Sequence, residues 1–200
     1  MKNKILVFLA MVVLFATTCA FAVTFTDVTE EHWANEYIMD LAEKEVVNGY
    51  PDGTFNPEGT ISRGEFLKLV IAASLPKDIS ITTAPSALDH WAGQYLFAAE
   101  TYRIVDSGSI TLENIDLPIT RREMALMISK ADVNLRGHAL NSEKYITFTD
   151  FDLMDASELR FLTHAISEEY LNGYPDGSFG PDQNMTRAES ATVIYRFSNK

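Results

Sequence analysis

Three short strings in the chain place a hydroxyl residue, an arginine and a glutamate at the same spacing. They read ISRGE at 61–65, ITRRE at 119–123 and MTRAE at 185–189. A serine or threonine followed three residues later by glutamate predicts a capping box, in which each side chain bonds to the backbone of the other at a helix start. The predicted pairs are Ser62 with Glu65, Thr120 with Glu123, and Thr186 with Glu189.

The capping boxes leave the arginine of each string unexplained. Arg63, Arg121 and Arg187 fall at the first helical position, where the helix dipole makes a cation unfavourable by about 0.3–1 kcal/mol. A carboxylate or phosphate bound at the helix N-terminus would compensate, because free N–H groups and a guanidinium suit an anion. An internal ion pair is the alternative, and so acidic a chain supplies many partners. The residues alone leave both interpretations open.

A second string recurs between the expected helices. NGYPDGTFNP at 48–57 returns almost unchanged as NGYPDGSFGP at 172–181. Proline presets φ, aspartate bonds back to the backbone and glycine completes a turn at low steric cost. A calcium loop is disfavoured, since Tyr50 holds the third position of the EF-hand count and Gly59 the twelfth, where glutamate is needed. The predicted turn residues are Tyr50, Asp52, Gly53, Tyr174, Asp176 and Gly177.

These strings belong to a longer internal repeat. A shift of 58 residues carries Trp33 onto Trp91 and Arg63 onto Arg121, and a shift of 124 carries Arg63 onto Arg187. Recurrence at such periods indicates a repeat architecture. The copies run from 25 to 75, 87 to 135 and 148 to 198, with 76–86 and 136–147 expected as linkers.

Each copy carries two stretches of helical periodicity. The apolar stripes of the first copy are Trp33, Tyr37, Ile38 and Leu41, followed by Phe66, Leu69, Val70 and Ala73. Two amphipathic helices cannot bury both stripes alone, so we expect three helix-turn-helix units to pool them in one all-α core. As stripe members, Trp33 and Trp91 are expected in the core.

The chain resembles the S-layer homology (SLH) family. FTDV at 25–28, HWA at 32–34, NGYPDGTFNP and ISRGEF carry the resemblance, and the three copies cover nearly all residues after 22. It implies a pseudo-threefold assembly in which each repeat lends one helix to a central three-helix bundle. It also implies non-covalent attachment to secondary cell wall polymers, often pyruvylated, in grooves between repeats.

Carried over to this chain, the resemblance assigns the polymer's acidic group to Arg63, Arg121 and Arg187. It implies that Trp33 and Trp91 shape the groove or pack beneath it, and that the turn residues of both strings shape its wall. Two departures stand out, because the second copy reads DSGSITLEN in place of the turn and the third has Ser157 at the tryptophan position. We therefore expect one or two grooves to be competent.

Composition and the N-terminal residues narrow the class of partner. The formal net charge of −12 argues against nucleic acid and against general adhesion to an anionic membrane. Residues 1–22 are predicted to be a secretory signal peptide, with Lys2 and Lys4 before an apolar run too short for a comfortable membrane span. No stable membrane insertion is expected after cleavage. The only cysteine, Cys19, would leave with that peptide, so we expect no disulfide and no thiol nucleophile.

The expected function is that of a bacterial cell-wall anchoring module that binds an anionic secondary cell wall polysaccharide, in a secreted or surface-held protein. The alternative is a structural or protein-interaction module at the cell surface that is derived from this family and does not bind polysaccharide. Catalysis is not expected, because no paired carboxylates stand out from solvated helix faces, and His138 and His164 have no evident partners. No metal and no cofactor are expected.

Overall fold

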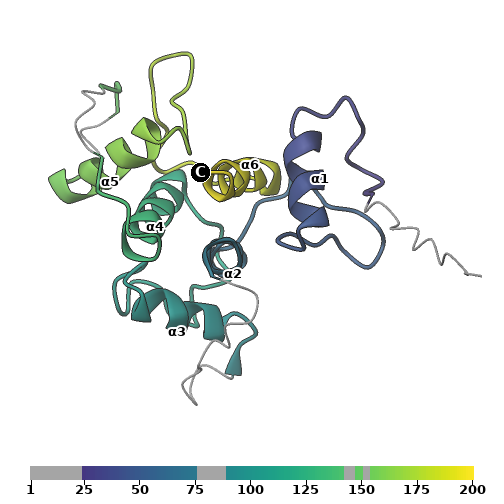
Figure 1. Cartoon of the computed structure of the whole chain (residues 1–200), viewed down its shortest axis with the longest axis horizontal. Coiled ribbons are helices and arrows are strands. Elements are labelled where there is room, and N and C mark those ends of the chain that lie inside the picture. The colour runs from purple at the N-terminus through teal and green to yellow at the C-terminus, as the bar shows by residue number, and fades with distance from the viewer. Residues whose placement is uncertain (1–23, 76–88, 142–146, 151–153) are drawn as a thin grey trace, which may run out of the picture.

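The computed structural model describes residues 24–75, 89–141, 147–150 and 154–200. These residues form six α-helices and no β-strand (Figure 1). The all-α class is thereby confirmed, whereas the predicted signal peptide and the predicted linker at 76–86 lie outside the described residues. None of the described helices is both long and apolar enough to span a bilayer. The helices are α1 (Asn35–Glu43), α2 (Arg63–Ser74), α3 (Gly93–Thr101), α4 (Arg121–Asn134), α5 (Ala156–Ser167) and α6 (Arg187–Ser198).

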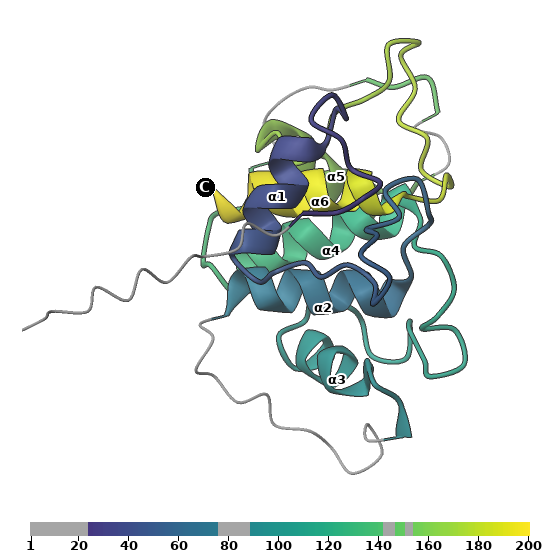
Figure 2. The same cartoon turned by 90° about the vertical axis from the view of Figure 1, so that its right-hand side faces the viewer.

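The helices α2, α4 and α6 lie side by side and roughly parallel at the centre (Figures 1 and 2). Each begins at a capping box, in which the serine or threonine side chain accepts the N–H of the glutamate and the glutamate accepts the N–H of the cap. Their apolar faces form the middle of the core. Fully buried residues of these faces are Phe66, Val70, Met124, Ile128, Ala191 and Ile194.

Each outer helix packs on a central helix that belongs to a different unit. Helix α1 packs on α6, α3 packs on α2, and α5 packs on α4 (Figure 1). An isolated helix pair would leave one apolar face of each helix in water, and this exchange buries both. The three units therefore share one core rather than three.

The chain segments that lead into the central helices are joined in a ring. The backbone N–H of Ile61 donates to the carbonyl of Met185 at 3.1 Å, Met185 donates to Ile119 at 3.1 Å, and Ile119 donates to Ile61 at 3.0 Å. Three isolated antiparallel bridges accompany these bonds. The ring fixes the N-terminal ends of the central helices beside one another, while the pseudo-threefold symmetry implied by the resemblance stays a prediction.

Candidate functional site

The repeated turn has nearly the same hydrogen bonds in both strings. Asp52 Oδ1 accepts the backbone N–H of Thr54 at 3.0 Å and its hydroxyl at 2.7 Å, and Asp176 binds Ser178 at 2.9 and 2.7 Å. The hydroxyl bond first, and then the backbone bond, lower the pKa of Asp52 and of Asp176 below the ordinary value. Gly53 follows with φ of +83°, a left-handed conformation that favours glycine. These hydrogen bonds fix the backbone conformation of the turn in both units.

A carboxylate that the sequence analysis did not single out fixes the strand-like segment after each turn. Asp27 accepts the N–H groups of Phe55 at 2.8 Å and Asn56 at 2.7 Å. Asp150 accepts the two corresponding N–H groups at 2.9 and 2.8 Å. The signal that could have identified these aspartates is the recurrence of the string FTD at 25–27 and 148–150.

Arg187 is the first residue of α6, and its side chain lies against the turn of the first unit. Its Nε donates to the Phe55 carbonyl at 2.8 Å, its Nη1 pairs with Glu65 Oε1 at 3.1 Å, and its Nη2 donates to the Asn48 carbonyl at 3.3 Å. The guanidinium also lies over the ring of Tyr50, 5.0 Å from its centre. Each of its three nitrogens therefore has a partner within the protein.

Arg63 repeats this arrangement against the second unit. Its Nε and Nη2 contact Glu123 Oε1 at 2.9 and 2.8 Å, and its Nη1 donates to the Asn114 carbonyl at 3.1 Å. The internal ion pair, one of the two interpretations left open by the residues, is thus present at Arg63 and at Arg187. In both pairs the partner is the capping-box glutamate of another unit.

Arg121 differs from the other two because it is almost fully buried, with 6% of its surface exposed. It donates to the Asn172 carbonyl, and its guanidinium lies 4.8 Å from the ring centre of Tyr174 and 4.9 Å from that of Phe179. Its buried Nε has no hydrogen-bond partner among the described residues. Burial lowers the pKa of Arg121, because desolvation disfavours the charged form.

The helix N-termini themselves offer no free N–H groups to an anion, contrary to the sequence-based interpretation. At the start of α2, the N–H of Arg63 donates to Leu117 at 3.1 Å and that of Gly64 to Ile115 at 2.9 Å, while Ser62 caps the third. The same pattern holds at α4 and α6. An anion at this site must therefore be held by side chains.

Trp33 and Trp91 are exposed, so the expectation that they belong to the core is wrong. Their exposed fractions are 57% and 50%. Both residues precede their helices, α1 and α3, and helical periodicity does not govern a residue outside the helix. The histidine before each one, His32 or His90, accepts the N–H of the following alanine through Nδ1 at 3.1 Å. This bond fixes the turn that presents the indole to solvent.

One cavity of about 210 Å³ collects residues from all three units. We call it the Arg187 groove and define it by Tyr50, Lys68, Trp91 and Arg187. Glu65 also lines it, so its charged side chains are two cations and one carboxylate. Of the sequence-predicted site residues, the structure brings Tyr50, Trp91 and Arg187 together here. Sequence reasoning missed Lys68, because nothing in the repeat pattern marks it.

A second cavity, of about 220 Å³, lies where the second unit meets the third. We call it the Asp106 groove and define it by Asp106, Glu123, Lys130 and Glu158. Lys130 is paired with Asp106 at 3.1 Å, and acidic side chains outnumber basic ones in its lining. None of the described residues that line it is aromatic. The second unit lacks the turn string, and the third has Ser157 in place of tryptophan. The charge of this groove disfavours an anionic ligand.

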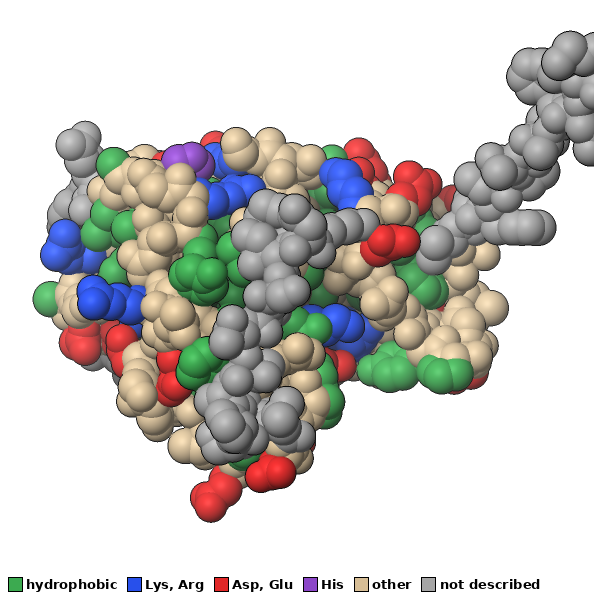
Figure 3. All heavy atoms as spheres, turned by 60° about the horizontal axis from the view of Figure 1, so that its bottom comes forward, with side chains coloured by type: hydrophobic (Ala, Val, Ile, Leu, Met, Phe, Trp, Pro, Cys, Tyr) green, Lys and Arg blue, Asp and Glu red, His purple; other side chains and the backbone are tan. Residues whose placement is uncertain are grey.

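The described residues on the face seen in Figure 3 form no large basic patch. Their lysine and arginine side chains lie in small groups among acidic and apolar ones. Attraction of an anion to this face therefore depends on individual cations rather than on a broad positive potential.

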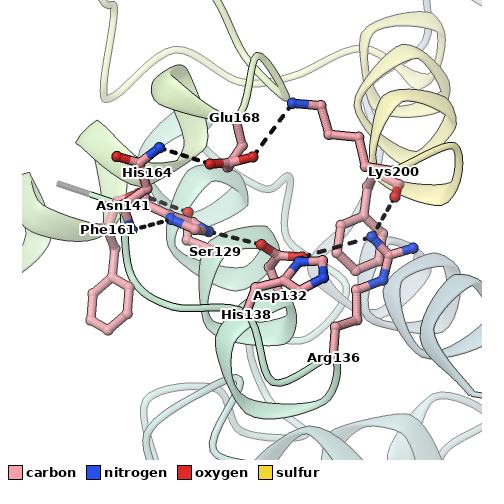
Figure 4. Close-up of polar contacts among 10 residues, drawn as sticks. Ser129, Asp132, Arg136, His138, Asn141, Phe161, His164, Glu168 and Lys200 are labelled. Carbon is pink, nitrogen blue, oxygen red and sulfur yellow. Dashed lines mark hydrogen bonds and ion pairs between the residues drawn. The ribbon is translucent and has the colours of Figure 1, made fainter. Parts of the chain in front are cut away.

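A polar cluster at the C-terminal end of α4 gives partners to the two histidines that had none in the sequence analysis (Figure 4). Buried Asp132 contacts His164 Nε2 and His138 Nδ1, each at 2.9 Å, and Arg136 at 3.7 Å. The N–H of Asn141 donates to His164 Nδ1 at 2.8 Å, which places the imidazole proton on Nε2, facing Asp132. Three residues of the predicted linker at 136–147, namely Arg136, His138 and Asn141, are thereby bound to the helices.

These features define a class of protein, an all-α domain whose helix-loop-helix units exchange outer helices and form clefts between units. The sequence model of the family described as "S-layer homology domain" matches residues 24–67 and 147–191. The two matched regions coincide with the first and third predicted repeats, so these parts of the chain are similar to S-layer homology domains. The middle repeat at 87–135 stays a prediction as a member of this family.

Several longer proteins are similar to the chain. The cellulosome-anchoring protein of Acetivibrio thermocellus is 24% identical over 88% of this chain and 26% of its own length. The S-layer protein EA1 of Bacillus anthracis is 28% identical over 86% of this chain and 20% of its own length. An endoglucanase of Bacillus sp. (strain KSM-635) is 29% identical over 86% and 18%. The chain thus spans about a quarter or less of the length of these relatives.

Proposed function

We propose that this domain anchors its protein non-covalently to the bacterial cell wall by binding an anionic, in many hosts pyruvylated, secondary cell wall polysaccharide. The observation that carries the proposal is the Arg187 groove, a cavity walled by three units in which two exposed aromatic residues flank two cations. Similarity to a cellulosome-anchoring protein and an S-layer protein supports a place at the cell surface. We propose a binding function and not catalysis.

The aromatic residues of the groove suit a saccharide. Tyr50 and Trp91 expose 43% and 50% of their surface beside one cavity. Large exposed aromatic rings leave apolar surface in water, and contact with the apolar face of a sugar ring removes it. The groove therefore offers a flat apolar contact for the ring and cations for an acidic substituent.

The test is sedimentation of the protein with purified Gram-positive peptidoglycan sacculi, before and after the acid extraction that strips secondary polymers. We expect the protein to pellet with untreated sacculi and to remain in the supernatant with extracted ones. Equal binding to both preparations would assign the ligand to peptidoglycan itself. Binding to neither would contradict wall anchoring.

A second candidate function is binding of another surface protein, as in the alternative drawn from the sequence. Leu112 and Leu117 favour it, because they expose 39% and 54% of their surface on the loop that replaces the turn of the second unit. A Leu112→Ser, Leu117→Ser double variant should then leave sacculus binding unchanged while abolishing capture of the partner. Unchanged capture would exclude this loop as the contact surface.

A further inference from the structure

Arg187 is poorly placed to hold the acidic group of a ligand. Its three nitrogens already contact the Phe55 carbonyl, Glu65 and the Asn48 carbonyl, and 11% of its side chain is exposed. Its charge is balanced by Glu65 at 3.1 Å. A ligand anion would meet a neutral ion pair here and would compete with bonds that join the first unit to the third.

Lys68 lines the same cavity, and a ligand anion would not have to displace a protein partner from it. It belongs to α2, one helical turn after Glu65, and it lines the Arg187 groove together with Trp91. Within the described part of the chain it makes neither a hydrogen bond nor an ion pair. An ammonium group in a cleft without a protein partner is free to pair with an incoming anion.

The lysine is also particular to this groove. At the corresponding positions the second unit has Leu126 and the third has Thr192. In the Asp106 groove, Lys130 is held by Asp106 at 3.1 Å. Of the two cavities, the Arg187 groove alone combines an unpaired cation with exposed aromatic rings.

We infer that Lys68, and not the repeated arginine, holds the acidic group of a saccharide ligand in the Arg187 groove, with the sugar ring against Trp91. This inference rests on the proposed wall-binding function and identifies the residue that binds the acidic group of the ligand. The ligand class is a saccharide that carries a carboxylate or a phosphate. Arg187 then serves as a brace that keeps Tyr50 and the turn in position.

Substitution of Lys68 tests the inference by sedimentation with untreated sacculi across a range of sacculus concentrations. Lys68→Gln should weaken binding about tenfold, because one charge-assisted hydrogen bond is lost, and Lys68→Arg should retain most of it. Lys130→Gln is the matched control, a lysine on the other cavity, and should bind as the wild type does. Melting temperatures of all three variants should stay close to that of the wild type.

The outcomes separate this inference from the proposed function. If the wild type binds and Lys68→Gln binds equally well, Lys68 does not hold the ligand and the inference is overturned. If the wild type fails to bind, the anchoring function itself fails. Competition by pyruvate or by inorganic phosphate, each compared with potassium chloride at equal ionic strength, distinguishes a carboxylate from a phosphate. Displacement by neither beyond chloride would also overturn the inference.

Discussion

Gly64 is the second residue of α2, where the other two units have Arg122 and Ala188. A Cβ atom added at Gly64 would lie 2.9 Å from the Cβ of Ala92 and 3.1 Å from Cγ1 of Ile115. Helix propensity alone favours alanine over glycine by about 1 kcal/mol. The contact with the second unit explains why this copy has glycine where the third has alanine.

We expect Gly64→Ala to lower the free energy of unfolding by about 1–3 kcal/mol, because overpacking in a tight contact outweighs the gain in propensity. Urea unfolding followed by circular dichroism measures the change. Ala188→Gly is the comparison at the corresponding position of α6, where the loss of helix propensity and of a fully buried methyl group should together lower the free energy of unfolding by about 1–2 kcal/mol. A higher free energy of unfolding for Gly64→Ala than for the wild type would show that Ala92 and Ile115 accommodate the added methyl group without a loss of stability.

The contacts of single residues also mark the limit of sequence reasoning. Ser62 and Glu65 are three residues apart, and Asp52 binds a residue two positions on, so local spacing was enough to identify their patterns. Lys68 and Trp91 line one cavity only because α3 packs on α2. No spacing in one sequence encodes that arrangement. The exposure of Trp91 was wrongly predicted for a different reason, because this residue precedes its helix.

At the scale of elements, Asp132 joins α4 to α5 and to the segment after α4 (Figure 4). Burial raises the pKa of this carboxyl, but the hydrogen bond from His164 and the charge of His138 outweigh burial and hold the pKa below its ordinary value. A carboxyl with a depressed pKa in the folded state stabilises the fold above its unfolded value of about 3.9. That contribution is lost as the pH falls through the folded value.

We expect Asp132→Asn to lower the free energy of unfolding at neutral pH by about 3 kcal/mol, because it leaves the buried partners of the carboxylate without a charge. The difference from the wild type should narrow as the pH falls below about 4, where Asp132 of the wild type also becomes protonated. Chemical unfolding at a series of pH values measures this difference. Asp106→Asn, at an exposed ion pair, is the control and should show little difference at any pH.

The helices themselves were largely predictable, because apolar periodicity and capping strings are local signals. The exchange of outer helices was not, since α1 carries the same apolar stripe whether it packs on α2 or on α6. The cluster around Asp132 was missed for a related reason. Asp132 and His164 are 32 residues apart and belong to different units, and the repeat pattern has no counterpart for either.

At the scale of the whole molecule, the shared core makes each unit dependent on the others. Helices of 9 and 12 residues, the lengths of α1 and α2, are marginal in water without tertiary packing. We expect a peptide of residues 24–75 to show little helix by far-UV circular dichroism, whereas the whole protein unfolds in one cooperative transition. A peptide with a sigmoidal urea transition of its own would contradict this dependence.

The packing of α1 on α6 places the first and last described helices against each other. In a protein anchored through the groove, a pull applied at either end of this domain would therefore load two helices that pack on each other. Units that were joined end to end, each with a core of its own, would unfold one at a time under such a pull. Here the units share one core and are joined by the three main-chain bonds of the ring, so we expect such a pull to unfold the domain in a single step.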